Sequence, residues 1–585
     1  MEFFAGVRSF QRARSSRSGF ESGKRPKVRE LLTIPAKNEV MATAIHAERA
    51  TEPWLARKRA QPMVAENQSA VIGFLASAAS HGGGTVTRID THSAIVFLAG
   101  NRAWKLKRAV QYDYLDFSTV ERRRVACEDE LRLNRRTAPT LYRGVSPVVR
   151  QADGALAIGG PGVAVDWLVE MNRFDEDQLF DRLAARRELG LDQMRPLAEA
   201  IAQFHAGAQP RPDHGGRAGM TWVVNGNAEG FAGFGASVLD SATCERVTDE
   251  ALRVIERQAA LLEIRRAGGL VRQCHGDLHL RNIVLLDGRP TLFDAIEFND
   301  EIACTDVLYD LAFLLMDFWR RQLPRHANAV WNAYLAETGD HSGLCLLPLF
   351  LSCRAAVRAK TSATAAWLQE NPGPKRELEC AARDYLTMAH RLLHPPPPSI
   401  AAIGGFSGTG KSTLALALAP GIGAAPGAVV LRSDEVRKRI CGMAPLERLG
   451  PEGYTPAVSQ RVYAALAAQA GAIARAGCSV IADAVYARPA DRKAIEQVAI
   501  DAGVPFLGTW LEAPEPLLLE RVRHRAADAS DAAANVLRMQ HTEGAGRITW
   551  QRLDATAPAD VVSTSAARMA ASTAATCDER GAHGA

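Results

Sequence analysis

The sequence lacks the features that mark secreted, zinc-binding and membrane-spanning proteins. Its ten cysteines are scattered along 585 residues, with no CxxC pair and no spacing of the kind that zinc sites use. Such cysteines are typical of reduced thiols, so we expect a cytoplasmic protein without a disulfide framework. No apolar run approaches the roughly 20 residues that span a bilayer; the run at 344–351, among the longest, is interrupted by Pro348. We therefore expect no contact with a membrane.

The chain also lacks a surplus of charge outside its first residues. Residues 1–40 contain nine Lys or Arg and four Asp or Glu, and this surplus of five equals the formal net charge of +5 of the whole chain. A nucleic-acid-binding domain usually carries a basic surplus, so we expect no nucleic-acid partner. Residues 1–65 show no sustained periodicity and no apolar signal-peptide region, which predicts a disordered basic extension, with Met41 as an alternative start inside it.

Length and a proline run predict how the chain is divided. At 585 residues it is too long for one ordinary hydrophobic core, so at least two domains are expected. Pro395 to Pro398 cannot continue a helix and favours an extended spacer. We therefore predict a basic extension (residues 1–65), a first domain (66–393), a proline linker (394–398), a second domain (399–565) and a disordered tail (566–585).

One stretch of the first domain, residues 275–300, has the spacing of a phosphoryl-transfer site. Asp277 precedes Asn282 by five residues, and two apolar runs then flank the turn signal Asp287-Gly288. This pattern predicts a hairpin that returns Asp294 beside Asp277. Phosphoryl transfer from ATP needs a carboxylate that accepts the proton of the attacking hydroxyl, and hard oxygen ligands for Mg²⁺. Asp277 suits the first role, and Asn282 and Asp294 suit the second.

The run HGDLHLRN and the following Asp294 resemble the HGDxxxxN loop and metal-binding Asp of the aminoglycoside phosphotransferase and choline kinase group, which are relatives of the protein kinases. The resemblance implies an α+β, protein-kinase-like bilobal fold for residues 66–393. It implies ATP and Mg²⁺ as cofactors. It also implies a strand lysine that contacts the nucleotide phosphates and a helix glutamate that orients the lysine.

A predicted strand and helix supply candidates for this lysine and glutamate. Short apolar runs predict an antiparallel meander whose third strand carries Lys105 and Lys107 on one face, since side chains alternate with period two. A helix is predicted over 118–136, with Ser118 or Thr119 as its cap. The strand pattern favours Lys105 over Lys107. Comparison of the helix with the resembling families favours Glu130 among the acidic candidates Glu128, Asp129 and Glu130.

Other residues of the first domain are predicted to support the site. The resemblance implies that the adenine contact is made by backbone near Glu170 and Met171, in a strand predicted over 163–171. His205, alone on a predicted helix, is expected to be structural. Asp306 and Asp310 lie four residues apart, on one face of a predicted helix. They resemble an Asp-rich helix start that supports the catalytic loop.

The second domain begins with the most specific signal in the chain, a GxxxxGKS phosphate loop between an apolar run and an Ala- and Leu-rich run. A strand before the loop and a helix after it are the required setting, because backbone N–H groups and a helix N-terminus then cradle phosphates. Lys411 is predicted to reach the terminal phosphates and to serve catalysis, and Ser412 to ligate Mg²⁺. The predicted nucleotide-binding residues are Gly405, Phe406, Ser407, Gly408, Thr409, Gly410, Lys411, Ser412 and Thr413.

Strands and helices alternate through the rest of this domain. After the strand that leads into the phosphate loop, apolar runs predict strands at 428–431, 478–482 and 505–511, and a short fifth strand at 560–562. This order predicts an α/β P-loop domain with a doubly wound parallel sheet and an active site at the carboxyl ends of the strands.

Charged residues that follow these strands complete the predicted second site. Asp434 and Arg437 form a DxxR that resembles the substrate-side motif of the zeta toxin, gluconate kinase and polynucleotide kinase-like group. The resemblance implies that Asp434 orients the acceptor hydroxyl. Asp483 stands where a second Mg²⁺-organising carboxylate is expected. Arg521 and Arg525 share a face of a predicted helix, as either a phosphate-binding lid or a solvated charged surface.

Together these patterns predict an ATP-dependent phosphotransferase whose two kinase-type domains act on hydroxyl groups of small molecules. The pairing resembles bifunctional aminoglycoside phosphotransferase-like proteins fused to a P-loop ATP-binding domain. Two alternatives stay open: the P-loop domain hydrolyses or senses nucleotide to regulate the first domain, or the first domain is a binding scaffold with a relic site. A third is phosphorylation of nucleic-acid ends, which no aromatic and basic tract supports. The acceptors themselves are beyond sequence patterns, because acceptor pockets form on variable loops and helices.

Overall fold

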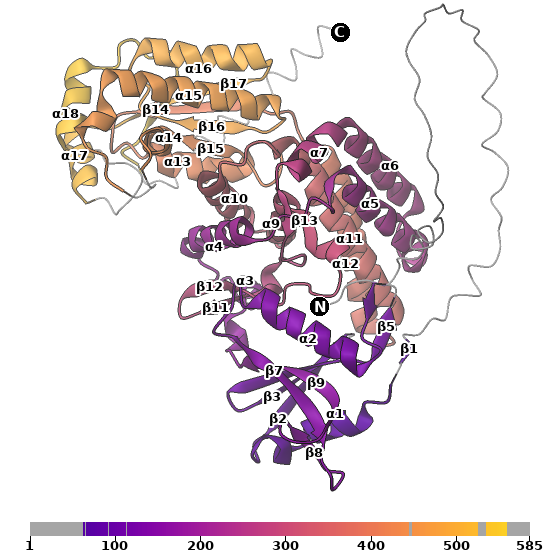
Figure 1. The fold of residues 1–585 in the computed structure, drawn as a ribbon. Helices are drawn as coiled ribbons and strands as arrows, with labels where there is room; N and C mark the ends of the chain where they lie inside the picture. The colour runs from indigo at the N-terminus through magenta and orange to yellow at the C-terminus, as the bar shows by residue number, and fades with distance from the viewer. Residues whose placement is uncertain are drawn as a thin grey trace, which may run out of the picture.

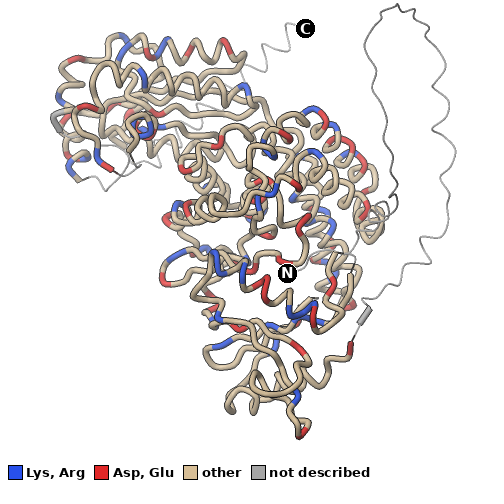
Figure 2. Tube along the Cα trace, in the orientation of Figure 1, with Lys and Arg blue, Asp and Glu red and all other residues tan. Residues whose placement is uncertain are grey.

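The computed structural model describes residues 63–64, 66–91, 93–112, 114–443, 447–524 and 534–557. The chain forms two units, and in Figure 1 the second, coloured orange, lies at the upper left of the first. Basic and acidic residues are interspersed over both units rather than gathered by sign (Figure 2). Among the described residues, no helix is both long and apolar enough to cross a bilayer.

The first unit begins with an antiparallel sheet that has a helix packed on each face. The bounds are α1 Ser69–Ala76, β2 Val86–Asp90, β3 Ala94–Ala99, β4 Arg102–Lys107, α2 Val120–Asn134, β7 Tyr142–Arg150, β8 Leu156–Ile158 and β9 Val163–Asn172. The strand order is β2-β3-β4-β9-β7-β8, so the predicted meander is confirmed. Helix α2 packs on β9 and β7, and the Thr119 side chain caps it by accepting the Arg122 N–H.

Helices make up most of the remainder of this unit (Figure 1). They pack around one apolar core in which α9 is buried on nearly all sides. The bounds are α3 Phe180–Ala185, α4 Met194–Gly207, α5 Gly216–Ala232, α6 Ser241–Arg257, α7 Ala259–Ala267, α8 Asp300–Ala303, α9 Val307–Arg320, α10 Pro324–Thr338, α11 Leu347–Leu368 and α12 Pro372–Leu393, with the short paired strands β10 Val271–Gln273 and β13 Cys304–Asp306.

The predicted hairpin forms between β11 (Ile283–Leu286) and β12 (Arg289–Leu292). Its turn residues Asp287 and Gly288 both have positive φ angles, 49° and 75°, which a two-residue Asp-Gly turn requires. Beyond the strands, the Phe293 N–H still donates to the Asn282 carbonyl. The hairpin therefore returns the chain to the loop that contains Asn282, one residue before Asp294.

The second unit is built on a parallel sheet. Its bounds are β14 Ile400–Gly405, α13 Lys411–Leu418, β15 Val429–Arg432, α14 Ser433–Ile440, α15 Pro456–Arg475, β16 Val480–Asp483, α16 Pro489–Ala502, β17 Phe506–Glu512, α17 Glu515–Arg523, α18 Ala534–Glu543 and β18 Gln551–Asp554. All pairings are parallel, in the order β15-β16-β14-β17-β18. Residues alternate along β14 between two cores, one containing α13 and the other containing α15 and α16, so helices cover both faces of the sheet.

The structure revises one prediction about the start of the chain and does not describe the residues of another about its end. Met63–Val64, inside the segment predicted to be disordered, forms the strand β1 and pairs with β5 (Val110–Tyr112), which also pairs with β6 (Leu115–Asp116). The strand that borders β17 is β18, whereas the strand predicted at 560–562 lies outside the described residues. Most of the basic extension and the predicted tail at 566–585 also lie outside them.

The two units meet where α10 of the first lies along β15, the edge strand of the second (Figure 1). Asn332 accepts the Val430 N–H at 2.7 Å and donates its amide N–H to the Ala428 carbonyl at 3.2 Å. Asn328 donates to the Pro426 and Ala428 carbonyls, each at 3.1 Å. Backbone groups on a sheet edge need partners when they are buried, and these amide side chains supply the bonds that another strand would make.

We predict that Asn332→Ala lowers the free energy of unfolding by about 1–3 kcal/mol, because it leaves the Val430 N–H without its side-chain partner and removes one of the two amide donors to the Ala428 carbonyl. Thermal and denaturant unfolding of the full chain measure this loss. The matched control is Asn225→Ala, at an exposed position on α5, which should change stability little. Equal stability of the two variants would show that the interface does not depend on this amide.

Candidate active sites

The first site contains a buried lysine held by two carboxylates from distant segments. Lys105 on β4 donates to Glu130 on α2 at 2.8 Å and to Asp294 at 2.7 Å. Burial alone would lower the pKa of Lys105, but the nearby Asp294 and Glu130 carboxylates outweigh it and raise the pKa well above its usual value. The lysine is therefore charged, and the pairing predicted between Lys105 and Glu130 is present.

A second lysine on the same strand shares Glu130. Lys107 donates to the other oxygen of Glu130 and also to Glu297, and both contacts are nearly closed to solvent. The sequence favoured Lys105 as the phosphate-contacting lysine, and in the structure it is Lys105 that reaches Asp294. Glu297 was not predicted. Its position three residues after Asp294, inside the stretch already singled out, was the available signal.

The catalytic-loop candidates Asp277 and Asn282 are bonded directly. Asn282 donates its amide N–H to the Asp277 carbonyl at 2.9 Å and to Asp277 Oδ2 at 3.1 Å. His279 Nε2 lies 3.4 Å from Asp277 Oδ1. Burial would raise the pKa of Asp277, but the attraction of His279 outweighs it, so the pKa lies below its usual value. The carboxylate is therefore ionised at neutral pH and able to accept a proton.

Asp310, in the first turn of α9, supports this loop from behind. It accepts the His275 N–H at 3.2 Å, the Gly276 N–H at 2.8 Å and a hydrogen bond from His205 at 3.1 Å. Both backbone groups precede Asp277 directly in the chain, and Gly276 has a φ of 80° that favours glycine. Asp310 thereby fixes the course of the loop, as predicted, and His205 has the structural role expected of it.

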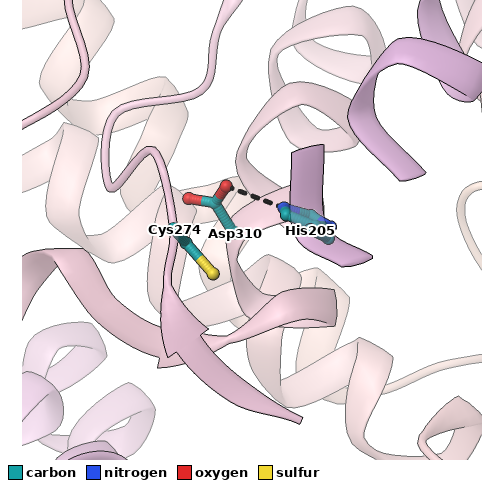
Figure 3. A group of neighbouring side chains, drawn as sticks. All are labelled: His205, Cys274 and Asp310. Carbon is teal, nitrogen blue, oxygen red and sulfur yellow. Dashed lines mark hydrogen bonds and ion pairs between the residues drawn. The ribbon is translucent and has the colours of Figure 1, made fainter. Parts of the chain in front are cut away.

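His205, Asp310 and Cys274 also form a group whose ligand atoms lie within 4.8 Å of one another (Figure 3). Burial raises the pKa of the Cys274 thiol well above its usual value, and the thiol donates to the Thr305 carbonyl at 3.4 Å. A metal would need a thiolate here. The group is therefore better explained as a hydrogen-bonded support of the loop.

Asp306 differs from its prediction. It does not share a helical face with Asp310, because it ends β13 and caps α9, where its side chain accepts the Leu308 N–H. It also forms a buried two-bonded ion pair with Arg265, at 2.7 and 2.8 Å. A cap residue has non-helical backbone angles, so helical spacing does not extend to it. Asp306 therefore supports the helix start and not the loop.

The oxygen donors of the first site suit a magnesium ion. Asn282 uses its amide nitrogen on Asp277, which leaves its amide oxygen as a ligand. Asp294 Oδ1 accepts a hydrogen bond from Lys105. Burial would raise the pKa of Asp294, but the attraction of this lysine outweighs that effect and holds the pKa below its usual value. An ionised carboxylate and an amide oxygen are hard ligands of the type that Mg²⁺ prefers.

In the second site, the phosphate loop joins β14 to α13. Gly405, Gly408 and Gly410 have φ angles of 142°, 85° and 88°. A Cβ at Gly405 would lie 2.7 Å from the Leu511 carbonyl and one at Gly408 would lie 2.9 Å from the Leu518 carbonyl, so the loop requires glycine there. Lys411 donates to the Phe406 carbonyl at 3.1 Å and thus lies across the loop. This geometry is the cradle that binds phosphates in P-loop proteins.

Ser412 and Asp483 are also brought together. The Ser412 hydroxyl donates to Asp483 Oδ2 at 2.5 Å, and Arg432 at the end of β15 lies 3.6 Å from the same carboxylate. Burial raises the pKa of Asp483, although Lys411 opposes this shift. A serine hydroxyl beside a carboxylate is the donor pair that organises Mg²⁺ in P-loop proteins, so the residues fit the predicted ion.

Three other predicted residues of this domain have different surroundings. Asp434 is half-buried in the first turn of α14 and interacts electrostatically with Asp483. Arg437 donates to the Gly453 carbonyl at 2.8 Å. Arg521 donates to the Ala555 carbonyl at 2.9 Å, which ties α17 to the end of β18. Arg525 lies outside the described residues, so the lid prediction remains a prediction.

Two residues of α18 lie on the phosphate loop and were not predicted. Gln540 accepts the Ser407 N–H at 3.0 Å, and the His541 ring lies 4.7 Å from the ring of Phe406. The loop N–H groups are those that bind phosphate oxygens. Neither residue belongs to a motif, and so no pattern in the sequence indicated that this helix reaches the loop.

Comparisons with known proteins agree with this division. Residues 185–346 match the family described as "Phosphotransferase enzyme family", and residues 400–544 match the one described as "AAA domain". "Uncharacterized protein Rv2004c" of Mycobacterium tuberculosis is 30% identical over 484 residues, which are 80% of this chain and 92% of that protein. An adenylyl-sulfate kinase of Myxococcus xanthus is 30% identical over 118 residues, 20% of this chain and 59% of that protein.

A solved choline/ethanolamine kinase family protein from Mesorhizobium loti is 14% identical, with a TM-score of 0.35, and the match covers 55% of this chain and 94% of that one.

The fold and the two sites define a chain with two kinase-type domains, a phosphotransferase-family domain followed by a P-loop domain. Because the similarity spans nearly the whole length of Rv2004c, the chain belongs to the two-domain family that this mycobacterial protein represents. The resemblance that the sequence motifs indicated is thus confirmed.

We predict that Lys411→Ala weakens ATP-Mg²⁺ binding at the phosphate loop by about 10- to 100-fold, because it removes a charged donor and leaves the loop backbone in place. Calorimetric titration of the full chain measures this change. Lys493→Ala, at an exposed position on α16, is the matched control. Unaltered affinity in Lys411→Ala would contradict the assignment of this loop to nucleotide.

Proposed function

We propose that both domains are active and that each transfers the γ-phosphoryl group of ATP to a hydroxyl group of a small molecule, the first on a bilobal kinase-like scaffold and the second on a doubly wound sheet. The observation that carries this proposal is the convergence of Lys105, Glu130 and Asp294 with the hairpin that leads back to Asn282 and Asp277. Phosphoryl transfer depends on positioned charges of this kind.

In the first domain, the two oxygens of Asp277 have different roles. Asn282 donates to Oδ2, whereas Oδ1 is buried, makes no hydrogen bond in the described part of the chain and has the His279 ring nitrogen 3.4 Å away. Oδ1 is therefore the atom that accepts the proton of the acceptor hydroxyl. As that proton leaves, the hydroxyl oxygen bonds to the γ-phosphorus and the bond from phosphorus to the ADP oxygen breaks. Lys105, oriented by Glu130, holds the nucleotide phosphates for this displacement.

Magnesium, held by Asn282 and Asp294, would neutralise charge on the phosphates when it is bound. In the second domain, Lys411 and the loop N–H groups bind the terminal phosphates, and Ser412 and Asp483 organise the ion. Asp434 orients the second acceptor hydroxyl from the start of α14. The partial similarity to an adenylyl-sulfate kinase supports a small acceptor here too.

Two further expectations belong to this proposal. The interspersed charges in Figure 2 support small molecules rather than nucleic acid as partners. The cysteines of the described residues are free thiols, which supports a cytoplasmic location.

A second candidate function is regulation of the first domain by the P-loop domain. The interface favours it, because β15 carries the Asn332 contact and ends at Arg432, whose guanidinium lies 3.3 Å from the Ser412 hydroxyl. Nucleotide at the phosphate loop could thus be linked to α10. ATP turnover at the second site without any phosphorylated acceptor would favour this function over a second kinase.

We predict that Asp277→Asn lowers phosphoryl transfer by the first domain by about 100-fold or more, because asparagine keeps the shape but cannot accept the proton. ATP-Mg²⁺ binding to that domain should persist, since Lys105, Asn282 and Asp294 are unchanged. Product formation and calorimetric titration measure the two effects separately. The matched control is Asp287→Asn in the exposed hairpin turn, where asparagine tolerates the positive φ.

The same experiment tests for two separate sites. Asp294→Ala should differ from Asp277→Asn by weakening the metal-dependent part of ATP binding. Two ATP sites per chain are expected, with Lys411→Ala affecting only the second. One site per chain, abolished equally by Asp277→Asn and Lys411→Ala, would contradict the proposal and indicate a composite site.

A further inference from the structure

A narrow pocket opens in the helical part of the first domain, between α5, α8, α9 and α11. Its lining combines aromatic, amide and charged side chains: Trp222, Asn227, Glu301, Tyr309, Arg354 and Lys360. None of these residues belongs to the motifs of the sequence, and the phosphoryl-transfer geometry described above uses none of them. Pockets of mixed apolar and polar lining are typical of small-molecule sites.

The pocket borders the catalytic loop. Arg354 donates through Nη1 to the Gly276 carbonyl at 3.2 Å, directly before Asp277 in the chain. One turn further along α11, Arg358 interacts electrostatically with Asp277. The pocket lining therefore contacts the residue directly before the carboxylate proposed as the base, on the side of the loop that faces α11.

Two buried polar atoms of the lining have no hydrogen-bond partner in the described part of the chain, Nη2 of Arg354 and Oδ1 of Asn227. Their residues are only 2% and 3% exposed. The nearest acid to Nη2 is Asp310, whose Oδ1 at 3.9 Å makes an ion pair but is too far for a hydrogen bond. Buried groups left unbonded are costly, so a ligand that bonds them gains affinity.

The charge of the deep lining is positive. Arg354 stacks on the Tyr309 ring at 3.9 Å, and Lys360 donates to the Gly226 carbonyl at 3.2 Å. Burial lowers the pKa of Lys360 to about 8, and the attraction of Glu229 offsets only part of that effect. The acid of the lining, Glu301, is half exposed and pairs with His214 at 3.3 Å.

We propose that this pocket binds the acceptor of the first domain and that the acceptor is a small hydroxyl-bearing anion, carrying a carboxylate or a phosphate. The inference rests on the proposed function of the first domain and adds the substrate class. Arg354 and Lys360 bind the anionic group, and Asn227 Oδ1 accepts a hydrogen bond from a hydroxyl group. The carbon skeleton lies against Trp222 and Tyr309, and a second hydroxyl faces Asp277. A cationic acceptor would place like charges together in a buried site, which is unfavourable.

The test compares acceptors that share a skeleton and differ in charge. Purified full chain, ATP and Mg²⁺ are incubated with D-glycerate, glycerol or serinol, and with glucose 6-phosphate, glucose or glucosamine. In at least one set the anionic member should have a kcat/KM about 10-fold or more above the neutral member, the scale of one charged hydrogen bond. The cationic member of each set should have the lowest kcat/KM. This activity should disappear in Asp277→Asn, which assigns it to the first domain.

Lys360→Met tests the pocket itself, since methionine keeps the length of the side chain and removes its charge. It should raise KM for the anionic acceptor about 10-fold and change kcat little, because the lost contact is not to the reacting atoms. The kcat/KM of the neutral acceptor should change little, because that acceptor has no charge for Lys360 to bind. Lys375→Met, at a lysine of α12 that does not line the pocket, is the matched control.

The outcomes separate the two proposals. Preference for neutral or cationic members, or an anion preference that Lys360→Met leaves unchanged, overturns the substrate class and leaves the kinase function standing. If no member of either set is phosphorylated in an Asp277-dependent reaction, both proposals fail together. The wild-type comparison needs no variant, so poor folding of Lys360→Met would not remove the test.

Discussion

The first domain depends on a buried cluster of two lysines and three carboxylates. Lys105 and Lys107 on one strand share Glu130 on α2, and each then reaches a carboxylate beyond the hairpin, Asp294 or Glu297. Buried charges are costly unless each is paired, and removing one partner leaves the others uncompensated. Three segments far apart in the chain must therefore meet at once. The same pairing that stabilises the fold holds Lys105, the proposed phosphate-binding lysine, against Asp294, the proposed metal ligand.

Asp310 extends this arrangement into the helical part of the domain. It holds the backbone of His275 and Gly276, accepts from His205 on α4, and lies 3.9 Å from Arg354 on α11. The proposed acceptor pocket is therefore built on the same buried carboxylate that fixes the catalytic loop. On the proposed function, acceptor binding and positioning of the base share this support, so a substitution of Asp310 should affect both.

The second domain uses fewer buried charged side chains at its site than the first. Its phosphate loop relies on glycine backbone and a helix start, and its carboxylate Asp483 is paired with Ser412 and Arg432. Contact with the first domain is made by amide side chains of α10 on the edge strand β15. Amide bonds to a sheet edge are directional but uncharged, so they set the relative position of the domains without adding charge to either site.

The sequence by itself determined the two domain types, the meander, the hairpin and both phosphate-handling motifs, because these depend on short stretches in which spacing and turn residues decide the geometry. Asp287-Gly288 alone is enough to reverse the chain. Tertiary structure alone decided that Glu297 shares the lysine cluster, that Gln540 lies on the phosphate loop, and that Asp306 caps a helix instead of supporting the loop. These contacts join residues through packing of distant segments, and no local pattern encodes which distant partner a buried side chain will meet.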